Sequence, residues 1–374
     1  MATVVPPLGS YQHVQETKEN LDWAELVTID LTTFNTPEGK KELAKQLIKA
    51  IREKGFFYVK GFDIPQEKVD RQFALGKQFY ELPLEVKQQY TPEGLVVAST
   101  QSRASATRRR STTSRSSPPT SSTTTTLSFR TGSARSRSLL SPSTTRSSTL
   151  STSSSPSLLS SPRTTSPRST PTSPSLRCED HFRYMKYGKR SAEENAKIKA
   201  WSFGHTDLGS FTLLFRQPVA ALQIKDPLTD EWKWVKPQDA TITVNSCDAL
   251  NFLTGGYVRS TIHRVTVPPK DQQHVDRLGL LYFSRPHNDV VLKTITESPV
   301  LQREGYTQND FEKTGNPVPT MEQWTFSKQA WQRSRKNDPK HYTATILPGW
   351  QEKIYDKELE TVIKNQQAQQ ISVA

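Results

Sequence analysis

Hydrophobic residues near the N-terminus follow first the spacing of a helix and then that of a strand. Leu43, Leu47 and Ile51 recur at every fourth position, which places them on one face of an amphipathic helix. Gly55 is expected to end this helix, because glycine is favoured just after a helix C-terminus. The run at residues 56–59 follows, and its aromatic and β-branched side chains predict a buried strand.

The neighbouring segments continue this alternation of strands and helices. Residues 27–31 alternate apolar and polar side chains, as a short strand does. Pro65 and Pro83 each stand at the start of a helical pattern, a position that proline favours. Residues 1–96 therefore predict an N-terminal α/β region.

From residue 178 to residue 290 the pattern changes to short β-prone runs separated by turn residues. The runs occupy residues 182–187, 211–215, 221–224, 232–235, 240–244, 260–267 and 277–284. Many short strands at this spacing are typical of a sandwich or barrel of the jelly-roll type. We therefore predict a mixed α/β protein that is mainly β, with its jelly-roll core at residues 178–290.

Residues 291–374 are predicted to form a helical extension. Thr320 is placed to cap a helix that carries Trp324 and Trp331. Aromatic residues in helices usually pack in a core, so we assign these side chains no chemistry. Residues 356–370 form a second, more polar amphipathic pattern.

Residues 97–177 differ in composition from both flanks. The segment consists mainly of Ser, Thr, Pro and Arg, and from Gly94 to Cys178 the chain has twelve Arg but no Asp, Glu or Lys. The formal net charge of +13 falls to about +1 when these arginines are left out. So few apolar residues cannot offset an ordering entropy of roughly 1–2 kcal/mol per residue, so we expect disorder here.

Three interpretations of this segment stay open. It is a regulatory Ser/Arg-rich linker, an RNA-binding arm, or a sequence that is not part of the native protein, such as a translated intron or a stretch read in a wrong frame. We favour the last interpretation, because the two flanks look like parts of one continuous fold. A spliced transcript that encodes the segment in frame would contradict it. Because the basic charge is confined to this segment, we expect no nucleic-acid partner.

The rest of the composition indicates an intracellular protein. Cys178 and Cys247 lack a CxxC spacing and suit a reducing cytosol. Residues 1–23 lack the apolar core of a signal peptide, and the chain has no apolar run of about 18 residues. We expect a cytoplasmic protein with no membrane partner. The oligomeric state stays open, with a monomer as the default.

Three residues form a pattern suited to binding a metal ion. His205 and Asp207 are two positions apart, so in an extended strand both side chains point to one face. His263 follows 56 residues after Asp207, on a separate β-prone run. Each motif alone is weak, since a single histidine is more often a core residue. Together, two imidazoles and one carboxylate can bind one face of an octahedral ion and leave the other face open, as in non-haem Fe(II) oxygenases.

The sequence around these residues resembles that of a known protein family. Residues 54–57, which precede a helix with Phe79 near its end, are similar to the N-terminal region of the isopenicillin N synthase-like iron(II)/2-oxoglutarate dioxygenases. Residues 248–256, the run Ser-Thr-Ile-His-Arg-Val at 260–265 and the following Arg277 resemble that family's core motif. The resemblance covers about residues 20–92 and 179–290.

This resemblance implies a fold and a set of site residues. The fold would be a double-stranded β-helix, with Fe(II) bound by His205, Asp207 and His263. Arg277 looks like the arginine that binds the far carboxylate of 2-oxoglutarate, a task that suits a guanidinium fork. Tyr187 matches a tyrosine that contacts the co-substrate in relatives; an ordinary strand aromatic is the alternative. A surface salt bridge is the alternative for Arg277.

The resemblance also implies the reaction. O₂ and 2-oxoglutarate would be consumed and succinate and CO₂ released, while a small organic molecule is hydroxylated, desaturated or cyclised. Iron requires neutral imidazoles and an ionised carboxylate, so its affinity should fall in acid. The family's usual Arg-x-Ser is Arg277-Leu278-Gly279 here. The missing hydroxyl removes a hydrogen bond worth about 0.5–1.5 kcal/mol, which leaves the strict need for 2-oxoglutarate open.

Two alternatives accompany this functional hypothesis. A catalytically impaired or mispredicted product would have an interrupted fold that cannot assemble the site. An oxidase would use the same three ligands without 2-oxoglutarate, as some relatives do. The substrate itself is not specified, and Phe252, Tyr257 and Arg285 are no better candidates for contacting it than their neighbours.

Overall fold

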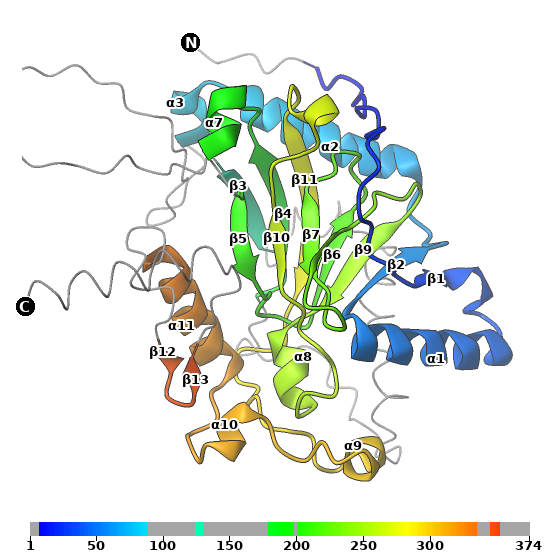
Figure 1. Cartoon of the computed structure of the whole chain (residues 1–374), viewed down its shortest axis with the longest axis vertical. Coiled ribbons are helices and arrows are strands. Elements are labelled where there is room, and N and C mark those ends of the chain that lie inside the picture. The colour runs from blue at the N-terminus through cyan, green and yellow to red at the C-terminus, as the bar shows by residue number, and fades with distance from the viewer. Residues whose placement is uncertain (1–6, 89–123, 131–178, 198–199, 335–344, 352–374) are drawn as a thin grey trace, which may run out of the picture.

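Two facing β-sheets form the centre of the protein (Figure 1). The computed structural model describes residues 7–88, 124–130, 179–197, 200–334 and 345–351. The large sheet has the strand order β1 (Thr28–Asp30), β2 (Phe56–Lys60), β9 (Ile242–Ser246), β6 (Phe211–Phe215), β11 (Arg277–Ser284), β4 (His181–Tyr187) and β3 (Thr124–Arg130). The small sheet has the order β5 (Ser202–His205), β10 (His263–Val265), β7 (Leu222–Lys225) and β8 (Trp232–Trp234). Every neighbouring pair is antiparallel except β1 with β2.

Helices surround this sandwich. The N-terminal ones are η1 (Leu31–Thr33), α1 (Pro37–Glu53), α2 (Gln66–Glu81) and α3 (Leu84–Gln88). Those of the core and the C-terminal part are α7 (Ala192–Lys197), α8 (Asp248–Leu253), η2 (Lys270–Gln272), α9 (Pro299–Arg303), α10 (Asp310–Lys313) and α11 (Met321–Ser334), followed by the hairpin β12 (Thr345–Leu347) and β13 (Trp350–Gln351). Figure 1 shows that α8 to α11 gather at one end of the sandwich. None of the helices in the described ranges is long and apolar enough to cross a membrane.

The first helix and the strand after it confirm the prediction from hydrophobic spacing. The Thr36 side chain caps α1 by accepting from the backbone N–H of Gly39, and the predicted stripe of leucine and isoleucine is buried. Gly55 follows with φ +66°, and a Cβ there would lie 2.6 Å from Oγ1 of Thr261. Both the left-handed backbone and the close approach therefore require glycine.

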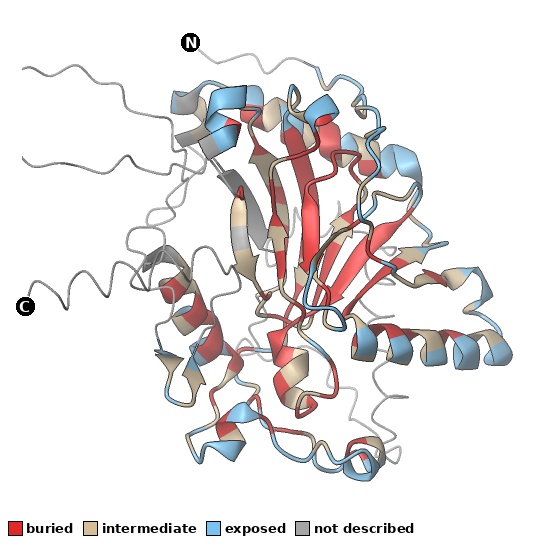
Figure 2. Ribbon diagram, in the orientation of Figure 1, coloured by how far each residue is buried: buried red, intermediate tan, exposed pale blue. Residues whose placement is uncertain are grey.

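The central strands of the large sheet are mostly buried (Figure 2). Their side chains alternate between two hydrophobic clusters. Phe57 packs outward in the cluster that joins the sheet to α1 and α2. Its neighbours Phe56 and Tyr58 pack in the other cluster, together with Leu222 and Ile224 of the small sheet. The period of two along a strand thus fills both the outer layer and the space between the sheets. This two-sheet architecture confirms the predicted jelly-roll class.

A separate hydrophobic cluster holds the C-terminal helices against α8. Phe252 of α8 packs with Phe311 of α10 and with Met321 and Trp324 of α11, all of them fully buried. The predicted helix after Thr320 is confirmed, and the Thr320 hydroxyl accepts from the backbone N–H three residues later. The second amphipathic pattern, at residues 356–370, lies outside the described residues.

The expectation of disorder for residues 97–177 was wrong for one short part. Residues 124–130 form β3, which pairs along its whole length with β4 at the edge of the large sheet. Its run of threonines with Leu127 and Phe129 has high β propensity, and the exposed edge of β4 supplies hydrogen-bonding partners. The rest of that segment lies outside the described residues.

Candidate metal centre and co-substrate site

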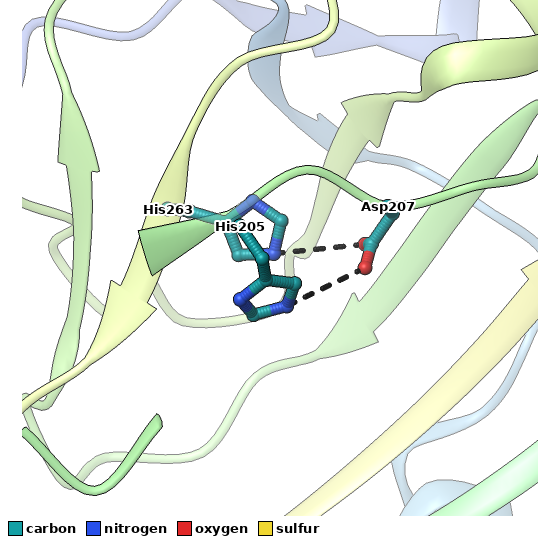
Figure 3. Close-up of side chains that lie close together, drawn as sticks. All are labelled: His205, Asp207 and His263. Carbon is teal, nitrogen blue, oxygen red and sulfur yellow. Dashed lines mark ion pairs between the residues drawn. The ribbon is translucent and has the colours of Figure 1, made fainter. Parts of the chain in front are cut away.

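The two candidate histidine ligands lie on neighbouring strands of the small sheet. His205 is the last residue of β5, and His263 is the first residue of β10. The two are direct partners in the antiparallel register, and their ring centroids are 4.5 Å apart (Figure 3). Strand pairing therefore brings together two residues that are 58 positions apart in sequence.

The carboxylate of Asp207 completes the group. Its Oδ1 lies 3.7 Å from Nε2 of His205, and its Oδ2 lies 3.6 Å from Nε2 of His263. One ligand atom from each residue lies within 4.8 Å of the others, which makes the three a candidate metal site. The side chains are 18%, 13% and 9% exposed for His205, Asp207 and His263, so the site is shielded but still reached by solvent.

Two neighbouring strands of the large sheet hold the Asp207 carboxylate. Thr212 of β6 donates its hydroxyl to Oδ2 at 2.7 Å, and Asn245 of β9 donates its side-chain amide to the same oxygen at 3.0 Å. Thr212 and Asn245 are themselves direct partners in the β6–β9 register. Burial raises the pKa of Asp207, but His263, His205 and the two hydrogen bonds lower it more, so the pKa lies well below its usual value.

The ring of His263 is oriented for coordination through Nε2. Its Nδ1 lies 3.1 Å from the backbone carbonyl oxygen of Thr261. A carbonyl only accepts hydrogen bonds, so Nδ1 carries the proton and Nε2 keeps its lone pair. The edge of Phe56 packs against the same ring, with centroids 5.4 Å apart. These contacts leave the ligand nitrogen directed towards Asp207.

Arg277 and Tyr187, the predicted co-substrate residues, are paired across the large sheet. They are direct partners in the β11–β4 register, and the guanidinium carbon of Arg277 lies 5.4 Å from the centroid of the Tyr187 ring. Both residues are 3% exposed. Burial lowers the pKa of Arg277 and raises that of Tyr187.

Arg277 has the features of a guanidinium that binds an anion. Within the part of the chain that the structure describes, its buried Nε has no hydrogen-bond partner. A buried donor without a partner is costly, and a carboxylate would satisfy it with a charge-assisted bond. The structure therefore does not support the alternative of a surface salt bridge.

Arg183 of β4 is a site residue that the sequence analysis missed. It lies within electrostatic reach of both Asp207 and Tyr187, and burial lowers its pKa to about 10. Its guanidinium carbon lies 4.4 Å from the centroid of the Phe283 ring. Arg183, Tyr187 and Arg277 thus share one face of the large sheet, towards Asp207. The sequence did contain a sign of this, because Arg183 is four residues before Tyr187 in one strand and its side chain must point to the same face.

The three residues considered for substrate contact are engaged elsewhere. Phe252 lies in the C-terminal hydrophobic cluster, and Tyr257 lies in the cluster beside α1 and α2. Arg285 pairs with Glu179, with Nη1 and Oε2 3.0 Å apart. We therefore assign none of them to the substrate.

A jelly-roll sandwich that brings two histidines and one aspartate together has the ligand set of a 2-His-1-carboxylate metal enzyme. Two family models match this chain. Residues 26–117 match the non-haem dioxygenase in morphine synthesis N-terminal model, and residues 178–286 match the 2OG-Fe(II) oxygenase superfamily. The chain belongs to the iron(II)- and 2-oxoglutarate-dependent dioxygenases, and its cofactors are Fe(II) and 2-oxoglutarate, with O₂ as co-substrate.

The chain is also similar to individual proteins. The UPF0676 protein C1494.01 of Schizosaccharomyces pombe is 24% identical over 79% of this chain and 88% of its own length. The 2-oxoglutarate-dependent dioxygenase iboH of Amanita muscaria is 40% identical, over 22% of this chain and 41% of its own length. A crystal structure of a full-length Neurospora crassa protein in complex with alpha-KG has a TM-score of 0.59 at 20% identity, covering 85% of this chain and 100% of that one. Because the two sequences are only 20% identical, this structural similarity is evidence for the fold alone.

Proposed function

We propose that this protein oxidises a small organic molecule by hydroxylation, desaturation or ring closure, using Fe(II), 2-oxoglutarate and O₂. The observation that carries the proposal is the arrangement of one metal-binding triad and one buried arginine on facing sheets. His205, Asp207 and His263 offer three ligand atoms within 4.8 Å of one another. Arg277 offers a buried nitrogen with no partner among the described residues.

In this proposal the protein's own residues prepare the site. His263 keeps its proton on Nδ1 through the Thr261 carbonyl, which leaves Nε2 as a ligand. Thr212 and Asn245 fix the carboxylate of Asp207 and favour its ionised form. No rearrangement of these groups is then needed when a metal ion binds.

Arg277 is proposed to bind the far carboxylate of 2-oxoglutarate, with Tyr187 beside it. A guanidinium is always charged and binds carboxylates through two parallel hydrogen bonds, so it both attracts and orients the co-substrate. When bound, the iron and 2-oxoglutarate supply the oxidising chemistry, in which 2-oxoglutarate is converted to succinate and CO₂. The burial of Arg277 and the triad limits the access of water to this chemistry.

The proposal can be tested with the purified full-length chain. Succinate should form from 2-oxoglutarate only when both Fe(II) and O₂ are present. The Asp207→Ala variant should form none, because it loses one of three ligands. A protein that binds iron and 2-oxoglutarate but forms no succinate with any of a broad set of small molecules would contradict the proposal.

A second candidate is a catalytically impaired product. It is supported by the Ser-, Thr-, Pro- and Arg-rich text at residues 97–177, which separates α3 from β4. Against it stand the pairing of β3 with β4 and the family match that extends to residue 117. Soluble, folded protein that fails to bind Fe(II) would favour this candidate, as would a transcript in which other residues replace the segment.

A further inference from the structure

A fully buried ion pair lies beside the metal-binding triad. Lys328 of α11 is 0% exposed and contacts the carboxylate of Asp248, the first residue of α8, which is 2% exposed. Burying two charges is costly unless they are paired and further hydrogen-bonded. Both side chains make further hydrogen bonds, and these go to segments that carry the metal ligands.

The Lys328 ammonium group also bonds to the turn between two metal ligands. Its Nζ donates to Oγ1 of Thr206 at 2.7 Å. Thr206 stands between His205 and Asp207, and it is 6% exposed. The lysine therefore restrains the one residue whose backbone sets the relative direction of these two ligands.

Asp248 connects the same pair to both ligand-bearing segments. Its backbone N–H donates to the carbonyl oxygen of Asp207 at 2.8 Å. Its Oδ1 accepts from the hydroxyl of Ser260 at 2.7 Å, three residues before His263. Each of the three metal ligands is therefore within three residues, in sequence, of a residue that is hydrogen-bonded to Lys328 or Asp248.

The position of Lys328 is fixed by its own helix. Trp324, one turn earlier, is fully buried in the C-terminal hydrophobic cluster, and the centroid of its ring lies 5.2 Å from Nζ of Lys328. Docking of α11 through Trp324 therefore aims the ammonium group at Thr206. Lys328 also lies beyond residue 286, outside both segments that match the family models.

We propose that Lys328 is a positioning residue of the metal centre. It holds Thr206 and Asp248 so that the three ligands are already in place when the metal ion arrives. This inference rests on the proposed function, because it assumes that the triad binds a metal ion. Partners that orient metal ligands typically change metal affinity by about 10–100-fold when they are lost.

The test uses Co(II) as the probe, with the full chain. Isothermal titration calorimetry gives the dissociation constant, and the visible absorption spectrum of bound Co(II) reports the ligand geometry. We expect Lys328→Met to weaken Co(II) binding by about 10–100-fold and to change the spectrum. Thr206→Val removes only the accepting hydroxyl and leaves the ion pair intact. It should cause a smaller loss, because it breaks only one of the two contacts of the ammonium group. Adding it to Lys328→Met should weaken binding little further, because the lysine variant already lacks that bond.

A matched control separates positioning from simple loosening of the helix. Met321→Ala removes a fully buried side chain from the same helix and the same hydrophobic cluster, outside the polar network. It should lower thermal stability but leave Co(II) affinity within about twofold of the unchanged protein. Equal losses of affinity in Met321→Ala and Lys328→Met would overturn the proposal.

The remaining outcomes are also decisive. Unchanged Co(II) affinity and spectrum in Thr206→Val would overturn the proposal, and this variant carries the test if Lys328→Met does not fold. If the unchanged protein itself binds no Co(II), the proposed function fails and the inference fails with it. If the unchanged protein binds Co(II) and the variants bind it equally well, only the inference fails.

Discussion

His205 and His263 face each other as direct partners in the pairing of β5 with β10, with ring centroids 4.5 Å apart. Antiparallel pairing sets this separation, so the geometry of the two nitrogen ligands depends on the register of one short ladder. The register also shifts by one residue between the pairs His263–His205 and Val265–Ser202, so β5 carries one extra residue just before His205. Asp207 comes from the turn after β5, and the large sheet holds its carboxylate. The metal centre therefore joins the two sheets.

Removing the carboxylate ligand should abolish stabilisation by metal. A ligand that binds only the folded state adds about 2.7 kcal/mol of stability at a free concentration 100 times its Kd. Co(II) should therefore raise the melting temperature of the unchanged protein and leave that of Asp207→Ala unchanged. Asp239→Ala is the control, because Asp239 is 86% exposed and pairs with Arg216 away from the triad. A metal-induced shift that persists in Asp207→Ala would contradict the ligand assignment.

Replacing Arg277 by Leu should weaken binding of 2-oxoglutarate without lowering stability. A hydrogen bond to a charged group contributes about 1.5–3 kcal/mol, so we expect a loss of affinity of roughly 10–150-fold. Stability should not fall, because the change removes a buried charge whose Nε has no partner among the described residues. Calorimetric titration with 2-oxoglutarate and a thermal melt measure the two effects.

The two readouts for Arg277 separate the alternatives. Arg277→Lys keeps the charge but loses the planar fork, and it should retain part of the affinity. A strong loss of stability in Arg277→Leu would indicate a structural ion pair. Substrate oxidation that continues unchanged in Arg277→Leu would indicate an oxidase that does not use 2-oxoglutarate.

The sequence was sufficient to predict the ligands because His263 stands within the run that resembles the family's core motif. The expectation from strand parity was wrong for Asp207, because β5 ends at His205 and Asp207 lies in the turn after it. The structure brings these three together as expected. Most strands of the core were also predicted within two residues, because alternation and turn residues are local signals.

The residues that support the ligands were missed because their roles depend on contacts between distant segments. Thr212 and Asn245 are polar positions in otherwise apolar strands, which was a signal, but only the β6–β9 register shows that both reach Asp207. Lys328 continues the helical stripe of Met321, Trp324 and Trp331, and a lysine in a buried stripe indicates a buried partner. The polar strand positions and the buried lysine indicate that each has a buried partner, but the sequence does not show which carboxylate that partner is.

Thr212→Val should weaken metal binding while leaving the fold intact. Valine has nearly the shape of threonine and high β propensity, so β6 should keep its packing. The Asp207 carboxylate would keep the hydrogen bond from Asn245 but lose the one from Thr212, at 2.7 Å the shorter of the two. We expect Co(II) affinity to fall by roughly tenfold, at the lower end of the range for such partners, measured by calorimetric titration. Thr243→Val is the control, because it makes the same change at a buried threonine on the same face of β9 that is not one of the two hydrogen-bond donors to Asp207, and it should bind Co(II) normally.

Gly279→Ser should strengthen binding of 2-oxoglutarate. Gly279 is two residues after Arg277 on β11, so its side chain would point to the same face as the guanidinium. A Cβ there would lie 3.4 Å from its nearest neighbour, the Cδ1 atom of Leu281, which is ordinary contact and leaves room for a serine. The added hydroxyl should contribute one hydrogen bond of about 0.5–1.5 kcal/mol, so the affinity should rise by roughly 2–12-fold in calorimetric titration. Gly279→Ala tests whether the gain comes from the hydroxyl, since it adds the carbon alone and should bind as the unchanged protein does. Equal affinities for the serine and alanine variants would show that position 279 does not reach the co-substrate.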